Sequence, residues 1–328
     1  KESTLVLRLP VPPAPVPADP AGATGTATDT APAVWPWYVV YGLTGAVALG
    51  FETVLFRLYD TIVRSNSYSF AHVLSLYLAL FGIGSAVGSR FVRRARRPGT
   101  WFLWIQFGVG LTALAGLVVF VRVLPYGPTG DAVRTYLARE GMVQGFTVAD
   151  GRLHPALVPV LVGAPLLLMG LPVLGMGASF PFVQALVASR LASLGRHTGL
   201  LLFANVVGNV TGTLLVGFVV IDAVGTAGTY RLLGLALLVP GLVAAAQTVA
   251  ARPAAAGPTR LPGDRRGVRA GAVVATATVM LVLVAVVPGN QRLYAGLHGV
   301  DPDRLHLAED RSCASALRVH PDGREEMT

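Results

Sequence analysis

Glu52, Asn205 and Asn209 are the polar side chains best placed to do chemistry, because each interrupts a long apolar segment. A carboxylate within a membrane helix costs about 2.5–3.5 kcal/mol on insertion scales, so it should face a bundle interior or a partner. Arg57 lies five residues on, about 140° around a helix from Glu52, and should reach outward to the membrane interface. Glu52 could then be a proton or substrate site, or form a structural hydrogen bond between helices.

The two asparagines stand four residues apart and therefore share one helix face. Two GxxxG pairs occur in the apolar segments, Gly84 with Gly88 and Gly208 with Gly212. Small residues let membrane helices approach closely, and amide side chains form hydrogen bonds across such contacts. These glycines are predicted to be helix-packing positions. The asparagines either join the packing seam as polar contacts or line a polar cavity that they share with Glu52.

The sequence carries no signature of catalytic, metal or nucleotide chemistry. Cys313 is the only cysteine, which excludes an intrachain disulfide and a thiolate metal cluster. The histidines are scattered without metal-ligand spacing. Glycine pairs at 82–84 and 175–177 lie inside apolar segments, whereas a nucleotide fingerprint needs a preceding strand. We therefore predict no catalytic residue, no metal site and no cofactor.

The composition is that of an integral membrane protein. Charged residues make up 13% of the chain, about half of the roughly 25% in soluble domains, and the mean hydropathy is +0.61. Such a chain cannot cover a water-facing surface and must present apolar faces to a lipid bilayer. The net charge of +9 sits in short clusters between apolar segments rather than on one face, which argues against nucleic acid as a partner.

Apolar segments long enough to cross a membrane, which takes about 20 residues, recur along the chain. They are 35–58, 71–92, 101–124, 156–186, 199–222, 229–251 and 270–288. The sequence therefore predicts an all-α polytopic membrane helical bundle of about seven transmembrane helices. The segment 156–186 is rich in proline and glycine, so it is expected to be kinked or broken, and its full crossing stays open.

Arginine residues give the expected orientation. They gather in the connections after the second, fourth and sixth apolar segments, and the opposite connections are poorer in them. Because positive residues concentrate on the cytoplasmic side, these connections and the N-terminus are predicted to be cytoplasmic. Seven crossings from that side leave residue 291 outside.

The chain divides into three regions. Residues 1–33 are rich in proline, alanine and threonine and are predicted to form an extended or disordered tail. Residues 34–290 form the transmembrane helical domain. Residues 291–328 are more polar. Side chains alternate in character near 314–319, and a turn signal follows at 320–323. This region is therefore predicted to be the start of a small, truncated, soluble β-rich module.

Several motifs along about residues 40–325 occur in a recognisable order. They are Gly50-x-Glu52-x-x-x-x-Arg57, Ser67-Tyr68-Ser69-Phe70, the stretch Gly82–Arg90, Met176-Gly177-Ala178-Ser179-Phe180-Pro181, the helix from Gly199 to Gly212, and His306–Arg324. Together they resemble the membrane part of bacterial spermidine-synthase-like membrane proteins, also called fused transporter/spermidine synthases. Phe203 stands where that family usually has tyrosine. A basic loop after a glycine-rich second helix also occurs in major-facilitator transporters.

The resemblance implies aminopropyl transfer only for a chain that continues into a Rossmann-like synthase domain. That domain's cofactor loop and catalytic aspartate are absent from this sequence, so no catalytic residue is carried over. We expect a non-catalytic module of the bacterial inner membrane that anchors or assembles with other membrane-protein subunits. The alternatives are a transporter-like bundle for a small cationic solute such as a polyamine, with Glu52 as counter-charge, and a membrane-anchored aminopropyltransferase if the gene continues past Thr328.

Overall fold

A computed structural model describes most of the chain from residue 34 onward. The described residues are 34–63, 67–122, 130, 162–187, 194–250, 262–298, 301–309, 314–319 and 325–327. The tail expected at 1–33 and the turn expected at 320–323 lie outside them. Residues 34–328 belong to one compact unit.

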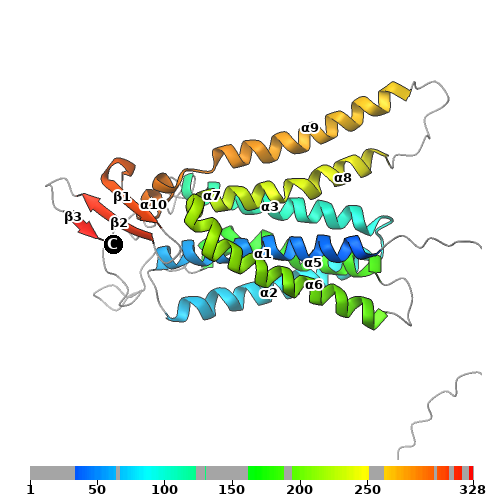
Figure 1. Ribbon diagram of the computed structural model, residues 1–328, viewed down its shortest axis with the longest axis horizontal. Coiled ribbons are helices and arrows are strands. Elements are labelled where there is room, and N and C mark those ends of the chain that lie inside the picture. The colour runs from blue at the N-terminus through cyan, green and yellow to red at the C-terminus, as the bar shows by residue number, and fades with distance from the viewer. Residues whose placement is uncertain are drawn as a thin grey trace, which may run out of the picture. The chain divides into compact units, whose positions relative to one another are not determined.

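Long apolar helices build this unit and lie side by side (Figure 1). They are α1 (Trp35–Val63), α2 (Ser67–Val92), α3 (Pro98–Arg122), α5 (Leu171–Val187), α6 (Leu194–Leu215), α7 (Ile221–Ala236), α8 (Leu238–Ala250) and α9 (Pro262–Val286). By length and composition, 5 described helices could cross a membrane, or up to 6 if α9 and the following short helix, bent by 61°, count as one. The structure thus supports the predicted helical membrane bundle.

One of these crossing helices, Gly195–Ala250, is too long for a single passage. Its 56 residues would extend about 84 Å if straight, against a hydrocarbon core of about 30 Å. The helix breaks at Gly225, whose φ of 70° and ψ of 178° are not helical, and the chain reverses there (Figure 1). The sequence had indicated a connection over 223–228; this was wrong, because one glycine makes the reversal and its neighbours stay helical.

The proline-rich fourth segment is continuous where the structure describes it, over 162–187. A π-helical stretch at Leu166–Gly170 leads into α5, and Pro181 lies inside α5. Local π-helical turns of this kind can accommodate proline and glycine while keeping backbone groups bonded. Leu166–Val187 is long and apolar enough to cross a membrane.

Two glycine seams bring helices together. A methyl group added at Gly84 or Gly88 of α2 would overlap the backbone of Leu174 or Ala178 in α5. Likewise, a methyl group at Gly208 or Gly212 of α6 would overlap the backbone of α1 at 42–46. The absence of a side chain therefore sets the spacing of both pairs, α2 with α5 and α1 with α6.

The polar C-terminal region packs onto one end of the bundle. It comprises α10 (Asn290–His298), a 3-10 turn (Pro302–Arg304), β1 (Leu305–Glu309), β2 (Ala314–Val319) and β3 (Glu325–Met327). The strands form an antiparallel sheet in the order β1-β2-β3, with Leu305 opposite Arg318 and Val319 opposite Glu325. Leu293, Tyr294 and Leu305 are at most 1% exposed and join the main hydrophobic core of the bundle.

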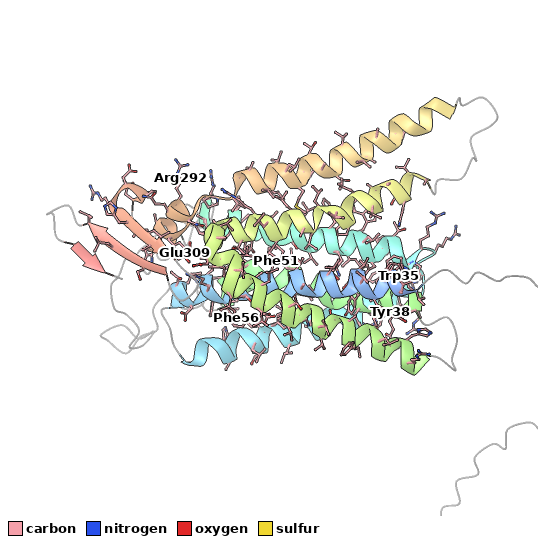
Figure 2. All side chains as sticks on the ribbon, viewed as in Figure 1. Trp35, Tyr38, Phe51, Phe56, Arg292 and Glu309 are labelled. Carbon is pink, nitrogen blue, oxygen red and sulfur yellow. The ribbon has the colours of Figure 1, made fainter. Side chains whose placement is uncertain are left out.

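Arginines of the chain connections are exposed at one end of the bundle. Trp35 lies at one end and Glu309 at the other (Figure 2). The exposed arginines between α2 and α3 share the Trp35 end, because Gly99, just after them, lies against the Trp37 ring. Exposed Arg196 is also there, since the neighbouring His197 forms a hydrogen bond with Tyr38 of α1.

Candidate functional site

Asn205 and Asn209 lie against α1 at its closest approach to α6. In the amide orientation that pairs donors with acceptors, Asn209 donates to the Gly45 carbonyl at 3.0 Å. Its oxygen then accepts from Asn205 Nδ2 at 3.2 Å. Gly45 has no side chain to block the two amides, which would lie too close to a Cβ at that position. The asparagines thus form a hydrogen-bonded pair within the packing seam.

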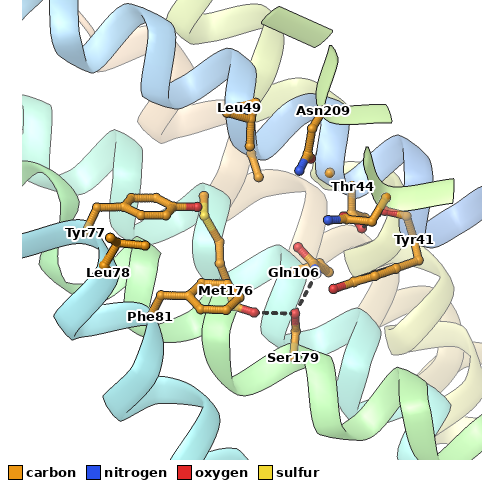
Figure 3. Close-up of a pocket in the computed structure, with 13 residues that line it drawn as sticks. Tyr41, Thr44, Leu49, Tyr77, Leu78, Phe81, Gln106, Met176, Ser179 and Asn209 are labelled. Atoms are coloured by element: carbon orange, nitrogen blue, oxygen red, sulfur yellow. Dashed lines mark hydrogen bonds between the residues drawn. The ribbon is translucent and has the colours of Figure 1, made fainter. Parts of the chain in front are cut away.

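The same asparagines line an open cavity of about 200 Å³ between the helices (Figure 3). Its polar lining side chains come from α1, α2, α3, α5 and α6: Tyr41, Thr44, Tyr77, Gln106, Ser179, Asn205 and Asn209. Gln106 is 4% exposed and donates to Ser179 Oγ at 3.1 Å, and Ser179 donates to the Met176 carbonyl. The asparagine pair is therefore both a contact in the packing seam and part of the cavity wall.

Glu52 does not line this cavity. It lies on α1 one turn beyond Ala48 and Leu49, which do. Glu52 is partly buried, and no hydrogen bond or ion pair joins it to a described residue. The structure thus brings the asparagines together and leaves Glu52 beside their cavity without a partner among the described residues.

A second polar site occurs at the Gly225 break, and sequence reasoning missed it. The helix restarts after Gly225, which frees the first backbone N–H groups of the new helix. The Thr226 N–H donates to Glu309 Oε1 at 2.9 Å, and the Ala227 N–H donates to Asn290 Oδ1 at 2.7 Å. Side chains from β1 and α10 therefore satisfy the start of the restarted helix.

Glu309 Oε1 gathers further donors in this site. The hydroxyl of Thr226 donates to it, and the hydroxyl of Tyr294 does so at 3.2 Å. Arg57 Nε lies 3.6 Å from the same oxygen and 3.3 Å from the Tyr294 hydroxyl. Burial raises the pKa of the Tyr294 hydroxyl, which keeps its proton available for donation.

Arg57, which was predicted to reach the membrane interface, has a specific partner at the bundle end. At the bundle end the side chain of Arg57 is 16% exposed, and that of its partner Glu309 is 5% exposed. A buried carboxylate needs a compensating charge, and the arginine supplies it. Its partner comes from the distant strand β1, which helix geometry alone could not indicate.

Weak sequence signals for this second site do exist. Gly225 lies between two apolar helical segments, where a glycine commonly marks a change of backbone direction. Glu309 ends the alternating strand Leu305-His306-Leu307-Ala308-Glu309 on the same face as the buried Leu305. An inward-facing acid on a strand edge calls for a partner, but only the fold shows that it is Arg57.

Within the described part of the chain, no three histidine, cysteine or acidic side chains gather as metal ligands would. The arrangement supports two other kinds of chemistry: hydrogen bonding of a small solute in the cavity, and retention of a carboxylate at the Gly225 break. Comparisons of the chain with protein-family models, with curated proteins and with solved structures find no match.

Proposed function

We propose that the chain is a non-catalytic membrane module that holds its C-terminal β segment docked on one end of the helical bundle. The observation that carries this proposal is the burial of Glu309 against Arg57 and the Thr226 amide. Leu305 of the same strand enters the bundle core beside Leu293 and Tyr294 of α10. Apolar packing and an ion pair together favour a fixed docking over a flexible tether.

In this proposal the bundle crosses the bacterial inner membrane seven times. Support comes from the Gly225 break, which divides the Gly195–Ala250 helix into two passages, and from α9, which is long and apolar enough to cross when taken together with α10. The exposed arginines at the Trp35 end favour a cytoplasmic N-terminus. The β segment then faces the outer side, where it could assemble with other membrane-protein subunits.

This orientation bears on the aminopropyltransferase alternative. A synthase domain that followed β3 would lie on the outer side, away from a cytoplasmic cosubstrate. A working enzyme would therefore need an even number of crossings. We favour the anchoring role for that reason, and determining the side of the C-terminal segment would decide between the two.

Thiol labelling of the full chain in lipid nanodiscs tests the docking. In a Cys313→Ser background, a cysteine replacing Leu305, which is 1% exposed, should react slowly with a membrane-impermeant maleimide. A cysteine replacing the exposed His306 serves as the fast reference. Adding Arg57→Gln should accelerate labelling at position 305, whereas the matched change of exposed Arg292 to Gln should not. Equal rates at positions 305 and 306 in the otherwise native chain would refute the docking.

A second candidate function is binding and passage of a small cationic solute such as a polyamine. The observation that favours it is the polar cavity beside Glu52, a carboxyl that no described residue pairs with. The cavity holds aromatic rings and hydrogen-bonding groups but no basic side chain among its lining residues. A cation would therefore find hydrogen-bond partners there, with Glu52 as the nearby counter-charge.

A further inference from the structure

The Gly225 break has the form of a ligand site that is already filled. Its donors come from three separate elements: the amide and hydroxyl of Thr226 in α7, the hydroxyl of Tyr294 in α10, and the guanidinium of Arg57 in α1. All converge on one oxygen of a carboxylate. The acceptor arrives from a fourth element, strand β1, through the side chain of Glu309.

The electrostatics of the site select an anion. The start of a helix carries partial positive charge on its free N–H groups, and Arg57 adds a full positive charge. Both act at a place where the carboxylate side chain is only 5% exposed, so water screens them weakly. Hydroxyl donors beside them add directional hydrogen bonds, which a carboxylate accepts well.

The room for a carboxylate comes from Gly225. A Cβ at this position would overlap the Asn290 amide and lie 2.7 Å from Glu309 Oε2. Glu309 Oε2 is itself buried and has no hydrogen-bond partner among the described residues. The chain's own ligand therefore uses one of its two oxygens and leaves the other without a partner, so it does not use the full hydrogen-bonding capacity of a carboxylate.

We propose that the Gly225 break is a carboxylate-binding site, that Glu309 fills it as an intramolecular ligand, and that a small monocarboxylate binds there when the Glu309 side chain is absent. The docking of the β segment then depends on a ligand that can be replaced. This inference rests on the docking proposed above, but it concerns the pocket that remains when the docked carboxylate is removed.

Chemical rescue of the full-length Glu309→Ala variant tests the site. The variant is purified in detergent, and its thermal midpoint is measured in sodium acetate and in sodium chloride of equal ionic strength. Acetate should raise the midpoint in a saturable manner, by about 2–4 °C at saturation, while chloride should not. Acetamide, which has the same shape without the charge, should have no effect.

Control variants test whether the acetate response depends on the empty site and on Arg57. The native chain and Glu309→Gln, whose sites are filled, should respond equally to acetate and chloride. Asp303→Ala removes an exposed acidic side chain from the same region and should behave like the native chain. Adding Arg57→Gln to Glu309→Ala should abolish the acetate response, because the positive charge that binds acetate is gone.

An equal response of Glu309→Ala to acetate and chloride would overturn the proposal, and so would an acetate response of the same size in the native chain. Failure to recover folded Glu309→Ala in either salt would overturn it too, because acetate should replace the missing ligand during purification. Acetate rescue combined with fast labelling at position 305 in the native chain would refute the docking function and retain the carboxylate site.

Discussion

Arg57 Nε in the first apolar helix lies 3.6 Å from Glu309 Oε1 at the end of strand β1. The pair joins the beginning of the helical bundle to its C-terminal sheet, at the place where Gly225 breaks the longest helix. A long apolar helix, a helix start and a β-strand thus share one cluster of polar contacts. A substitution in any one of these three elements should therefore weaken the polar contacts of the other two.

Arg57→Gln should lower the free energy of unfolding by about 3–5 kcal/mol, because it leaves the buried carboxylate of Glu309 without its counter-charge. Denaturation of the detergent-purified protein, followed by tryptophan fluorescence, would measure the loss. Arg292→Gln removes the same charge from the exposed surface of α10 and should change stability by less than about 0.5 kcal/mol. Similar losses in both variants would mean that the ion pair contributes nothing specific.

Gly225→Ala should destabilise the protein by roughly 1–3 kcal/mol through backbone strain alone, since φ of 70° with ψ of 178° is essentially restricted to glycine. Overlap with Asn290 adds to that cost. Gly271→Ala is the control, because a Cβ there meets open space on α9 and its backbone is helical. A Gly225→Ala protein as stable as Gly271→Ala would contradict the described break.

Gly84→Ala should weaken the contact between α2 and α5 by about 1–3 kcal/mol, because the new methyl group would overlap the backbone of Leu174. Gly82→Ala, two residues away on the same helix, should be nearly neutral, since no atom lies within 4 Å of its Cβ position. Measuring the thermal unfolding midpoints of the two variants under the same conditions would test this difference. Equal midpoints would exclude the close approach of α2 to α5.

Glu52→Gln should reduce uptake of a radiolabelled polyamine into proteoliposomes by at least about tenfold if the second candidate function holds, since the counter-charge beside the cavity is lost. Asp303→Asn removes an exposed carboxylate elsewhere and should leave uptake unchanged. Native uptake with Glu52→Gln would exclude a transport role for this carboxyl. The anchoring role predicts no uptake by any of the three proteins.

Ser179→Ala should lower the free energy of unfolding by about 1–3 kcal/mol, because the buried amide of Gln106 loses its hydrogen-bond acceptor at the cavity wall. Replacing both residues, Ser179 by Ala and Gln106 by Leu, should recover much of that loss. A double-mutant cycle on thermal unfolding measures the coupling between the two side chains. Additive effects would show that the hydrogen bond carries no coupling energy.

The long helices could be predicted from sequence because each is a local property: a run of about 20 apolar residues has few alternatives to a helix in a membrane. Likewise, the spacing of Asn205 and Asn209 placed both on one helix face. The limits of this reasoning appear at Gly225. Hydrophobicity indicated a loop over 223–228, whereas the structure makes the reversal at one glycine and keeps its neighbours helical.

Glu52 and Arg57 show which properties follow from the sequence and which require the tertiary structure. The sequence by itself determined that this is a highly apolar chain, that its apolar runs suit helices, and that a carboxyl and an arginine interrupt the first of them. Only the tertiary structure decided that Arg57 pairs with Glu309, and that Glu52 lies beside the cavity of Asn205 and Asn209 with no partner in the described part of the chain. The physical reason is that helix formation depends on neighbours in sequence, whereas charge pairing depends on which distant elements the packed core brings together.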